Sequence, residues 1–372
     1  MVLHKKPPLT FIKVLFLAFI YIISLCSLFV AFQFYEKGHR SYRENLGTRM
    51  SPTGDPETTE RKNAKYQWTE NLSHETPAPP SPSPASSSEY LNIKSYPYII
   101  NEPNKCQDET PFLIFLIETI ASEVENRKAI RATFGNMIVY KRFSIMCLFL
   151  LGKDNTQDPN AILEESKKYQ DIIQKDFQDT YKNLTIKTMM GIEWVSNYCP
   201  TARYVMKTDS DMFVNTDRLL DLLGPDLPQK LNFFTGFVME NHQPHRSIDS
   251  KWYMPHSLFP DPFYPTLCSG TGYVFSGDVA SKILRSSSKV KYVYLEDVFV
   301  AICLDREGIK ITHPPNGLFH NYRVEFSPCA YNSIITSHYI NPTFLIKYWS
   351  VVQNDKEKCS MSRESSTSIN NI

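Results

Sequence analysis

Residues 203–215 read RYVMKTDSDMFVN: an apolar run leads directly into Asp209-Ser-Asp211, and apolar residues then resume. In open α/β sheets, ligands bind at the carboxyl ends of the strands. Two carboxylates in that position suit a hard divalent cation, which can bridge a diphosphate. The alternative is a turn in which the Asp side chains bond the backbone. The preceding strand pattern and the following Phe-Val-Asn favour a metal site.

Further apolar runs of strand length surround this segment. They are short and rich in aliphatic and aromatic residues, as buried strands are, and they cover residues 112–117, 143–152, 232–238 and 272–277. Helix-like segments lie between them, at Asn126–Phe134, Ala161–Phe177 and Leu184–Asn197. Strands that alternate with helices predict an α/β fold with a mostly parallel central sheet, in a single domain over residues 96–352.

The composition of the chain argues against several classes of protein. Its 372 residues carry a formal net charge of +1, so there is no basic excess to neutralise the phosphates of a nucleic acid. The eight cysteines include no Cys-x-x-Cys pair, and the sequence contains no HExxH, P-loop or GxGxxG run. A structural zinc site, a zincin, a P-loop nucleotidase and a dinucleotide-binding enzyme are therefore poorly supported.

The N-terminal part of the chain predicts a membrane anchor. Val14 to Phe32 carries no charge, and a helix of about 20 apolar residues spans a bilayer. The run ends without a small-residue cleavage site, which favours an uncleaved signal anchor over residues 14–34, after a cytoplasmic tail at 1–13. A buried core helix is the alternative. Basic residues flank the run on both sides, so charge alone leaves the orientation open.

Polar segments lie on both sides of the predicted domain. Residues 35–95 include PAPPSPSPASSS at 77–88, which cannot bury enough apolar surface to fold and predicts a largely disordered stem. Residues 353–372 predict a polar, disordered tail. Two sequons, Asn71-Leu-Ser and Asn183-Leu-Thr, predict glycosylation of both asparagines, whereas Asn341-Pro-Thr is blocked by its proline. With a single anchor, the sequons favour a stem and domain in the secretory lumen.

Seven of the cysteines lie beyond the anchor run. Because seven is odd, at least one of them is free or pairs between chains. Cys147 lies inside an apolar strand pattern and is predicted to be an inert core thiol. The candidate disulfides are Cys303–Cys329 and Cys199–Cys268, although spacing does not determine connectivity.

Three other motifs carry residues that could act chemically or contact a ligand. Glu296 and Asp297 precede an apolar stretch, where acidic residues could act chemically or favour a helix N-terminus. The run CSGTGYVFSG at 268–277 contains small residues that let a backbone approach a ligand, or that form a tight turn. Arg127 and Arg131 are four apart on one helical face, and could meet phosphate or be solvated.

Taken together, these motifs resemble the beta-1,3-glycosyltransferase family, and within it the beta-1,3-galactosyltransferases. The similarity covers about residues 98–352. It rests on YIINEPNKC, the Arg-x-x-x-Arg-x-Thr-aromatic-Gly run, VMKTDSDMFVNT, SKWYMP, CSGTGYVFSGD and LEDV. The resemblance implies a GT-A-like catalytic domain in the Golgi lumen, carried by a single-pass type II anchor. It therefore supplies the orientation that the charges leave open.

The resemblance also implies roles for individual residues. Asp209, Asp211 and His338 would hold Mn²⁺ on UDP-galactose, with His320 as the second choice of histidine. Asp297 would be the catalytic base. Donor contacts are predicted for Arg127, Arg131, Lys207 and Asp209. Acceptor contacts are predicted for Trp252, Tyr253, Gly270, Gly272 and Glu296; for the two aromatic residues, which suit the apolar face of a pyranose, ordinary packing is the alternative.

Two departures from the resemblance stand out. Relatives usually carry Trp where this chain has Phe134, a change that can alter packing beside the nucleotide. Near residues 318–322 they usually read Phe-Asn-His-Trp, whereas this chain reads Leu318-Phe-His-Asn-Tyr322. The second difference could shift the acceptor preference.

The predicted activity is transfer of galactose from UDP-galactose to the 3-hydroxyl of a terminal GlcNAc-type acceptor on a glycoprotein or glycolipid. The anomeric carbon inverts, so one displacement suffices and the enzyme needs a base and no nucleophile. One alternative keeps the chemistry and uses UDP-GlcNAc. Another is a non-catalytic lumenal chaperone or sugar-binding protein, which would typically lack the carboxylates that this chain retains.

Overall fold

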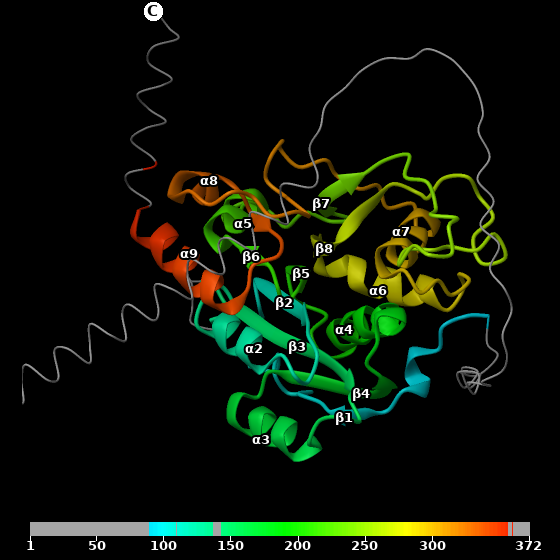
Figure 1. The fold of residues 1–372 in the computed structure, drawn as a ribbon, viewed down its shortest axis with the longest axis horizontal. Helices are drawn as coiled ribbons and strands as arrows, with labels where there is room; N and C mark the ends of the chain where they lie inside the picture. Colours follow the sequence, from blue (N-terminus) through cyan, green and yellow to red (C-terminus); the bar gives the residue numbers. More distant parts are fainter. Residues whose placement is uncertain (1–88, 109, 137–142, 356–358, 360–372) are drawn as a thin grey trace, which may run out of the picture. The chain divides into compact units, whose positions relative to one another are not determined.

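The computed structural model describes residues 89–108, 110–136, 143–355 and 359. Seven strands form one sheet in the order β1-β4-β3-β2-β5-β8-β7 (Figure 1). Their bounds are β1 Tyr98–Ile100, β2 Leu113–Glu118, β3 Ile145–Lys153, β4 Ile172–Gln178, β5 Tyr204–Asp209, β7 Phe234–Met239 and β8 Leu267–Ser276. A separate two-stranded ladder joins β6 (Phe213–Val214) to β9 (Thr336–Ser337).

The middle of the sheet is parallel. β2 pairs in parallel with both β3 and β5, and β3 pairs in parallel with β4. β1 and β8 run antiparallel to their neighbours. Every residue of β2 is buried, as expected for a central strand covered on both faces. The prediction of a mixed, mostly parallel α/β sheet is therefore confirmed.

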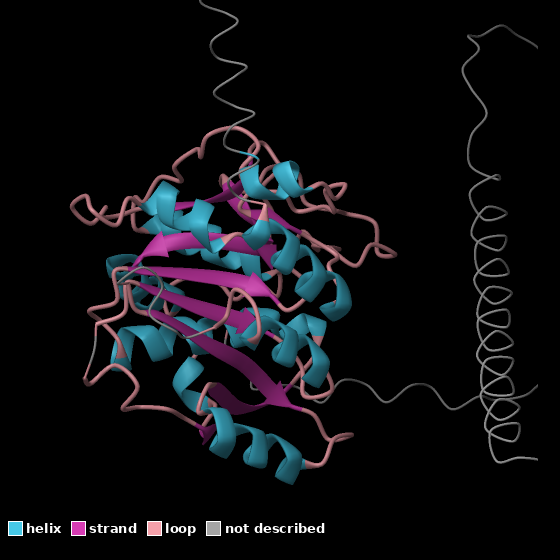
Figure 2. Ribbon diagram, turned by 90° about the vertical axis from the view of Figure 1, so that its left-hand side faces the viewer, coloured by secondary structure: helices cyan, strands magenta, loops and turns pink. Residues whose placement is uncertain are grey.

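Helices cover both faces of the sheet (Figure 2). Leu113, Phe115 and Ile117 of β2 pack into one core cluster, and Ile114 and Leu116 into the other, because successive side chains of a strand point to opposite faces. The cluster with Ile114 and Leu116 includes residues of α4 (Leu184–Tyr198), α6 (Gly277–Ser287) and α7 (Glu296–Arg306). The cluster with Leu113, Phe115 and Ile117 includes residues of α2 (Val124–Arg131), α3 (Pro159–Tyr169), α5 (Thr216–Leu223), α8 (Pro328–Ser333) and α9 (Pro342–Asn354).

One predicted helix is half wrong. The segment Ala161–Phe177 divides into α3, which ends at Tyr169, and strand β4. Gln170 takes a left-handed conformation with φ of 51° and ends the helix. Residues 172–175 are all buried between β3 and β1, so the sheet, and not a helical period, determines their conformation.

The folded part of the chain extends beyond both predicted boundaries. Leu91 and Ile93, which the sequence analysis places in the stem, are buried in the core, and the carbonyl of Ile93 accepts a hydrogen bond from Lys175 Nζ at 3.0 Å. At the other end, Cys359 of the predicted tail is buried and disulfide-bonded. These buried contacts make residues 89–95 and Cys359 part of the domain.

In the part of the chain that the structure describes, no helix has the length and apolar character needed to cross a membrane. The predicted anchor at 14–34 and the sequon at Asn71 lie outside the described residues.

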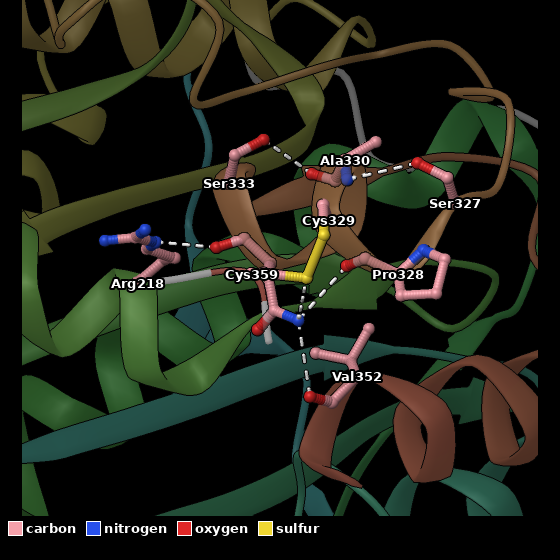
Figure 3. Close-up of a disulfide and its surroundings, with 9 residues drawn as sticks. Arg218, Ser327, Pro328, Cys329, Ala330, Ser333, Val352 and Cys359 are labelled. Carbon is pink, nitrogen blue, oxygen red and sulfur yellow. Dashed lines mark hydrogen bonds between the residues drawn. A yellow bond between two sulfur atoms is a disulfide. The ribbon is translucent and has the colours of Figure 1, made fainter. Parts of the chain in front are cut away.

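Both candidate disulfides are wrong. The structure pairs Cys106 with Cys199, and Cys329 with Cys359 (Figure 3). Cys199 directly follows α4 and meets the loop after β1, with a Cα–Cα distance of 5.5 Å. Cys268 on β8 and Cys303 on α7 are instead buried free thiols, and so is Cys147, as predicted. Burial raises the pKa of all three thiols, which makes them unreactive.

Removing the disulfide at the C-terminal end should destabilise the domain. It closes a loop with a sequence separation of 30 residues, and in the chain-entropy model such a crosslink contributes about 3–4 kcal/mol. The double variant Cys329→Ala with Cys359→Ala is expected to lower the free energy of unfolding in urea by about that amount. Cys147→Ala serves as a control for loss of one buried sulfur. A midpoint and slope equal to those of the unmodified protein would contradict the pairing.

Candidate active site

The site is built where β2 and β5 end side by side. Glu118 and Asp209 are the last residues of these strands and lie opposite each other in the parallel register. Lys207 stands between them, with Nζ 2.8 Å from Glu118, 2.8 Å from Asp209 and 2.5 Å from the carbonyl oxygen of Gly270. The sequence analysis missed Glu118, although an acidic residue closing an apolar run is a visible signal.

The sequence predicts a donor contact for Lys207, and in the structure its ammonium group is engaged by groups of the protein itself. The three partners named above use the three protons of an ammonium group, and Lys207 is buried. Burial opposes its charge, but Asp209, Glu118 and Glu296 outweigh burial and hold the pKa of Lys207 well above its usual value. Burial in turn raises the pKa of Asp209 to about 6, against the opposing effect of Lys207. Lys207 therefore positions Asp209.

A group of three side chains could hold a metal ion. Ligand atoms of Asp209, Asp211 and His338 lie within 4.8 Å of one another. The β6–β9 ladder brings them together, because it aligns Phe213 with Ser337 and so places His338 beside Asp211, with 3.3 Å between Nε2 and Oδ2. Nδ1 of His338 lies 3.1 Å from the carbonyl oxygen of Asn321, which leaves Nε2 for a ligand.

This donor set fits a divalent cation. Two carboxylates and an imidazole suit first-row metals such as Mn²⁺. Burial by itself would lower the pKa of His338, but the neighbouring Asp211 raises it. The second choice of histidine, His320, bonds Tyr322 Oη and the carbonyl of Gly317. Among the described residues, His320 is not part of the possible metal site formed by Asp209, Asp211 and His338.

Asp297 is the second residue of α7. Leu295 occupies the N-cap position, so the carboxylate of Asp297 is not the helix cap. It accepts hydrogen bonds from the backbone N–H of Val298 at 2.9 Å and of Gly270 at 3.3 Å. Burial raises the pKa of Asp297, although these backbone donors and Lys207 oppose the rise. A carboxylate with a raised pKa is a better proton acceptor.

Gly270 links the base to the lysine. Its N–H faces Asp297 and its carbonyl accepts from Lys207. A Cβ at this position would lie 2.7 Å from Oε2 of Glu296, so a side chain would displace the acidic pair. Gly272 lies further along β8, opposite Thr208 of β5, and is part of the antiparallel pairing of these two strands.

Glu296 was predicted to contact the acceptor, but it is buried beneath the site. It accepts a hydrogen bond from Tyr273 Oη at 2.5 Å and lies 3.6 Å from Lys207 Nζ. Burial, only partly offset by Lys207, raises the pKa of Glu296 to about 8. Its buried position supports the neighbouring base, and its acceptor contact stays a prediction.

A cavity of about 250 Å³ opens beside Asp297. Trp252, for which the sequence predicts a sugar contact, lines this cavity, whereas Tyr253 is not among the lining residues. His245 packs on Trp252 with ring centroids 5.5 Å apart, and His242 stacks on Tyr264 at 6.4 Å. The sequence analysis missed both histidines, whereas Asn321, which also lines the cavity, belongs to the segment 318–322 that departs from the relatives' pattern. The aromatic wall suits the apolar face of a sugar ring.

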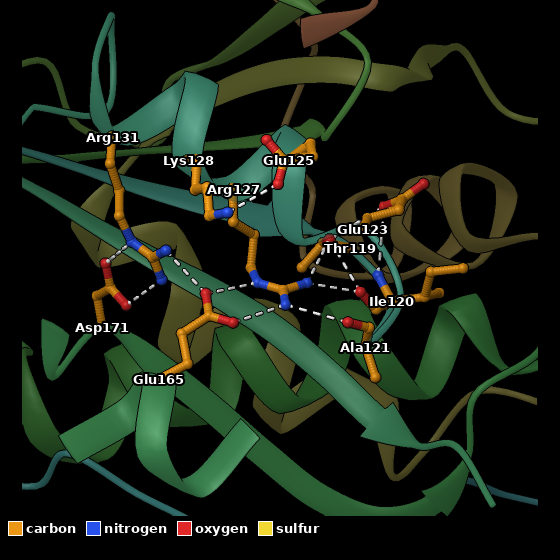
Figure 4. Close-up of polar contacts among 10 residues, drawn as sticks. All are labelled: Thr119, Ile120, Ala121, Glu123, Glu125, Arg127, Lys128, Arg131, Glu165 and Asp171. Carbon is orange, nitrogen blue, oxygen red and sulfur yellow. Dashed lines mark hydrogen bonds and ion pairs between the residues drawn. The ribbon is translucent and has the colours of Figure 1, made fainter. Parts of the chain in front are cut away.

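Arg127 and Arg131, for which the sequence predicts donor contacts, are paired with acidic side chains (Figure 4). Arg127 is fully buried, and its guanidinium bonds both oxygens of Glu165 and the carbonyls of Ile120 and Ala121. Arg131 pairs with Asp171 at 2.7 Å and with Glu165 at 2.7 Å. Glu165 of α3 and Asp171, which directly precedes β4, neutralise the two guanidinium groups. Arg127 also connects the loop after β2 to α3. The donor contacts of Arg127 and Arg131 stay a prediction.

Phe134, the position where relatives usually carry Trp, is buried in the core. Its ring packs edge-on against Phe115, with centroids 5.5 Å apart. The aromatic side chain at this position thus supports β2 from one face.

Two family models and several relatives match this chain. Residues 125–315 match the family described as galactosyltransferase, and residues 48–114 match the beta-1,3-galactosyltransferase 2 N-terminus. Human beta-1,3-galactosyltransferase 2 is 52% identical over 270 residues, 71% of this chain and 64% of that protein. Mouse beta-1,3-galactosyltransferase 1 is 45% identical over 269 residues, 72% of this chain and 81% of that protein.

The matched part thus spans less than two thirds of beta-1,3-galactosyltransferase 2. Among solved structures, a glycosyltransferase involved in glycosylation of the major capsid of PBCV-1 aligns with a TM-score of 0.35 and 9% identity, over 65% of this chain and 100% of that chain. That likeness is too slight to bear on the fold. The extent of the sequence matches is sufficient by itself, and the chain belongs to the galactosyltransferase family.

Proposed function

We propose that the protein transfers galactose from UDP-galactose to the 3-hydroxyl of a terminal β-linked GlcNAc, or a related N-acetylhexosamine, with inversion at the anomeric carbon. The observation that carries this proposal is the position of Asp297. Its carboxylate lines the cavity with the aromatic wall, and Gly270 and Lys207 connect it to Asp209. This arrangement supports the assignment of Asp297 as the base for an acceptor hydroxyl, beside a site for a nucleotide diphosphate.

The proposed reaction is a single displacement. Asp297 accepts the proton of the acceptor 3-hydroxyl while the oxygen of that hydroxyl forms a bond to the anomeric carbon of galactose. The bond between that carbon and the diphosphate oxygen breaks, and its electron pair leaves with UDP. A positioned base typically contributes 10²–10⁴-fold to the rate of such a step. One displacement inverts the anomeric carbon, so no enzyme nucleophile is required.

Asp209, Asp211 and His338 are the side chains that would hold a divalent ion here. When bound, Mn²⁺ would supply Lewis-acid neutralisation of the charge that develops on the departing diphosphate. The role of Lys207 is to fix Asp209 and to compensate the buried carboxylates of Glu118 and Glu296.

The function is tested with the purified full chain and a matrix of donors and acceptors. The donors are UDP-galactose and UDP-GlcNAc, and the acceptors end in GlcNAc, GalNAc or galactose. We expect transfer from UDP-galactose to the GlcNAc-terminated acceptor, and a β1–3 linkage in the product by NMR. Preference for UDP-GlcNAc would replace the donor assignment. Sugar binding without turnover under all donors would favour a non-catalytic role.

We further propose that the domain lies in the Golgi lumen, behind the predicted anchor. Asn183 occupies the N-cap position of α4 and is partly exposed, and its Nδ2 donates a hydrogen bond to the carbonyl of Gln178. For protein made in secretory cells, an endoglycosidase should increase gel mobility in two steps, one for each of Asn71 and Asn183. Asn71→Gln and Asn183→Gln should each remove one step. Wild-type protein that shows no shift would contradict lumenal placement.

A further inference from the structure

The cavity beside Asp297 is lined by one carboxamide residue, Asn321. Its other lining side chains are aromatic, aliphatic, imidazole or hydroxyl groups apart from Asp297 itself: Met239, His242, His245, Trp252, Tyr264, Leu267, Ser269, Leu295 and Val298. Asn321 lies in the loop between α7 and α8. The proposed reaction assigns no role to it.

Backbone bonds hold Asn321 in place. Its carbonyl oxygen lies 3.1 Å from Nδ1 of His338, and the next carbonyl, that of Tyr322, accepts from the N–H of His338 at 3.1 Å. On the other side, the N–H of His320 donates to Oγ1 of Thr336 at 2.8 Å. These contacts position the segment without using the side chain of Asn321.

The amide group of Asn321 remains available. Within the described ranges, its side chain makes no hydrogen bond, and the residue is half-buried. A carboxamide offers two N–H donors and one carbonyl acceptor. A polar group that is partly withdrawn from water and unpaired gains most from a ligand that pairs with it. The groups next to the 3-hydroxyl of a hexosamine, a 2-acetamido and a 4-hydroxyl, can do so.

We propose that Asn321 is a specificity-determining residue, whose amide hydrogen-bonds the acceptor sugar at a group adjacent to the attacking 3-hydroxyl. This inference rests on the proposed function. It predicts that the aromatic wall holds the sugar ring by its apolar face, while Asn321 distinguishes one hexose from another. A site built to pair a polar group discriminates strongly against an analogue that lacks it.

The test compares the full chain with Asn321→Ala and with Asn321→Leu, which fills a similar volume without hydrogen-bonding groups. With a GlcNAc-terminated acceptor, KM for the acceptor should rise about tenfold, equal to ~1.4 kcal/mol. Turnover at saturating acceptor and KM for the donor should stay within about twofold. Asn155→Ala, which removes an exposed asparagine side chain, should leave all three unchanged.

Two further acceptors identify the group that is read. If the amide pairs with the acetamido group, the variants should lose their preference for GlcNAc over glucose; if it pairs with the 4-hydroxyl, they should lose it for GlcNAc over GalNAc. Either result supports the proposal. If both preferences and KM stay within about threefold of wild type, Asn321 has no such role.

The Mn²⁺ dependence of activity distinguishes direct acceptor recognition by Asn321 from an indirect effect through His338. If Asn321 acted only by holding His338, its variants would change the Mn²⁺ concentration for half-maximal activity without changing acceptor preference, which would overturn the proposal. Calorimetric binding of the acceptor in the presence of UDP and Mn²⁺ keeps the two proposals distinct. Weaker binding to Asn321→Ala would support the role of Asn321 even if transfer of galactose itself were not observed.

Discussion

Replacing Asp297 with asparagine is expected to lower turnover by about 10²–10⁴-fold, the range for loss of a general base. Asparagine has the same shape and can still accept the hydrogen bond from Val298, but it cannot take a proton from the acceptor. Folding should remain nearly intact, since Leu295 and not Asp297 occupies the N-cap of α7. The measurement is turnover together with UDP affinity on the same purified variant.

The matched control is Asp305→Asn, an exposed position on the same helix. It should leave turnover unchanged. If Asp297→Asn stayed within about threefold of wild type, Asp297 would not be the base, since even a tenfold loss corresponds to only ~1.4 kcal/mol of barrier. If UDP affinity fell together with turnover, Asp297 would belong to the metal site instead.

Replacing Asp211 with alanine should remove most transfer activity and weaken UDP-sugar binding. The site would lose the carboxylate that faces His338 at 3.3 Å and would hold a divalent ion less tightly. The diphosphate would then lose the counter-charge of that ion. We expect a loss of at least about 10²-fold, comparable to removal of one positioned stabilising group in other enzymes. His338→Ala should raise the Mn²⁺ concentration needed for half-maximal activity, since two of the three ligands would remain.

Asp221→Ala is the control for loss of an acidic side chain, because Asp221 is exposed on α5 and pairs only with Arg218 among its described salt-bridge partners. It should behave as wild type. Transfer at an undiminished rate after removal of divalent ions by a chelator would rule out the metal role. Restoration of activity by added Mn²⁺ would support it.

Local patterns in the sequence were sufficient for the elements and for the acidic residues of the site. Continuous apolar runs predict β2, β3 and β5 because central parallel strands are buried on both faces. The Asp209-Ser-Asp211 pair follows such a run, so its place at the carboxyl edge of the sheet could be read directly. The failure at Ala161–Phe177 shows the limit, since a short apolar run suits a helix or a strand equally.

Residues that act through partners distant in sequence could not be assigned in this way. Arg127 and Arg131 share a helical face, but only the fold shows that Glu165 and Asp171 lie against that face and neutralise them. The disulfides are a similar case, because Cys106 and Cys199 meet only when α4 packs against the sheet.

The sequence by itself determined the central strands β2, β3 and β5, the Asp-x-Asp pair at the end of β5 and the acidic residues at the start of α7, since each depends on the order of nearby residues. Only the tertiary structure decided that His338 meets Asp211 across the β6–β9 ladder, and that Asn321 reaches the cavity of Asp297. The physical reason is that hydrogen bonding and charge compensation depend on which side chains converge in space, and a one-dimensional pattern does not contain those distances.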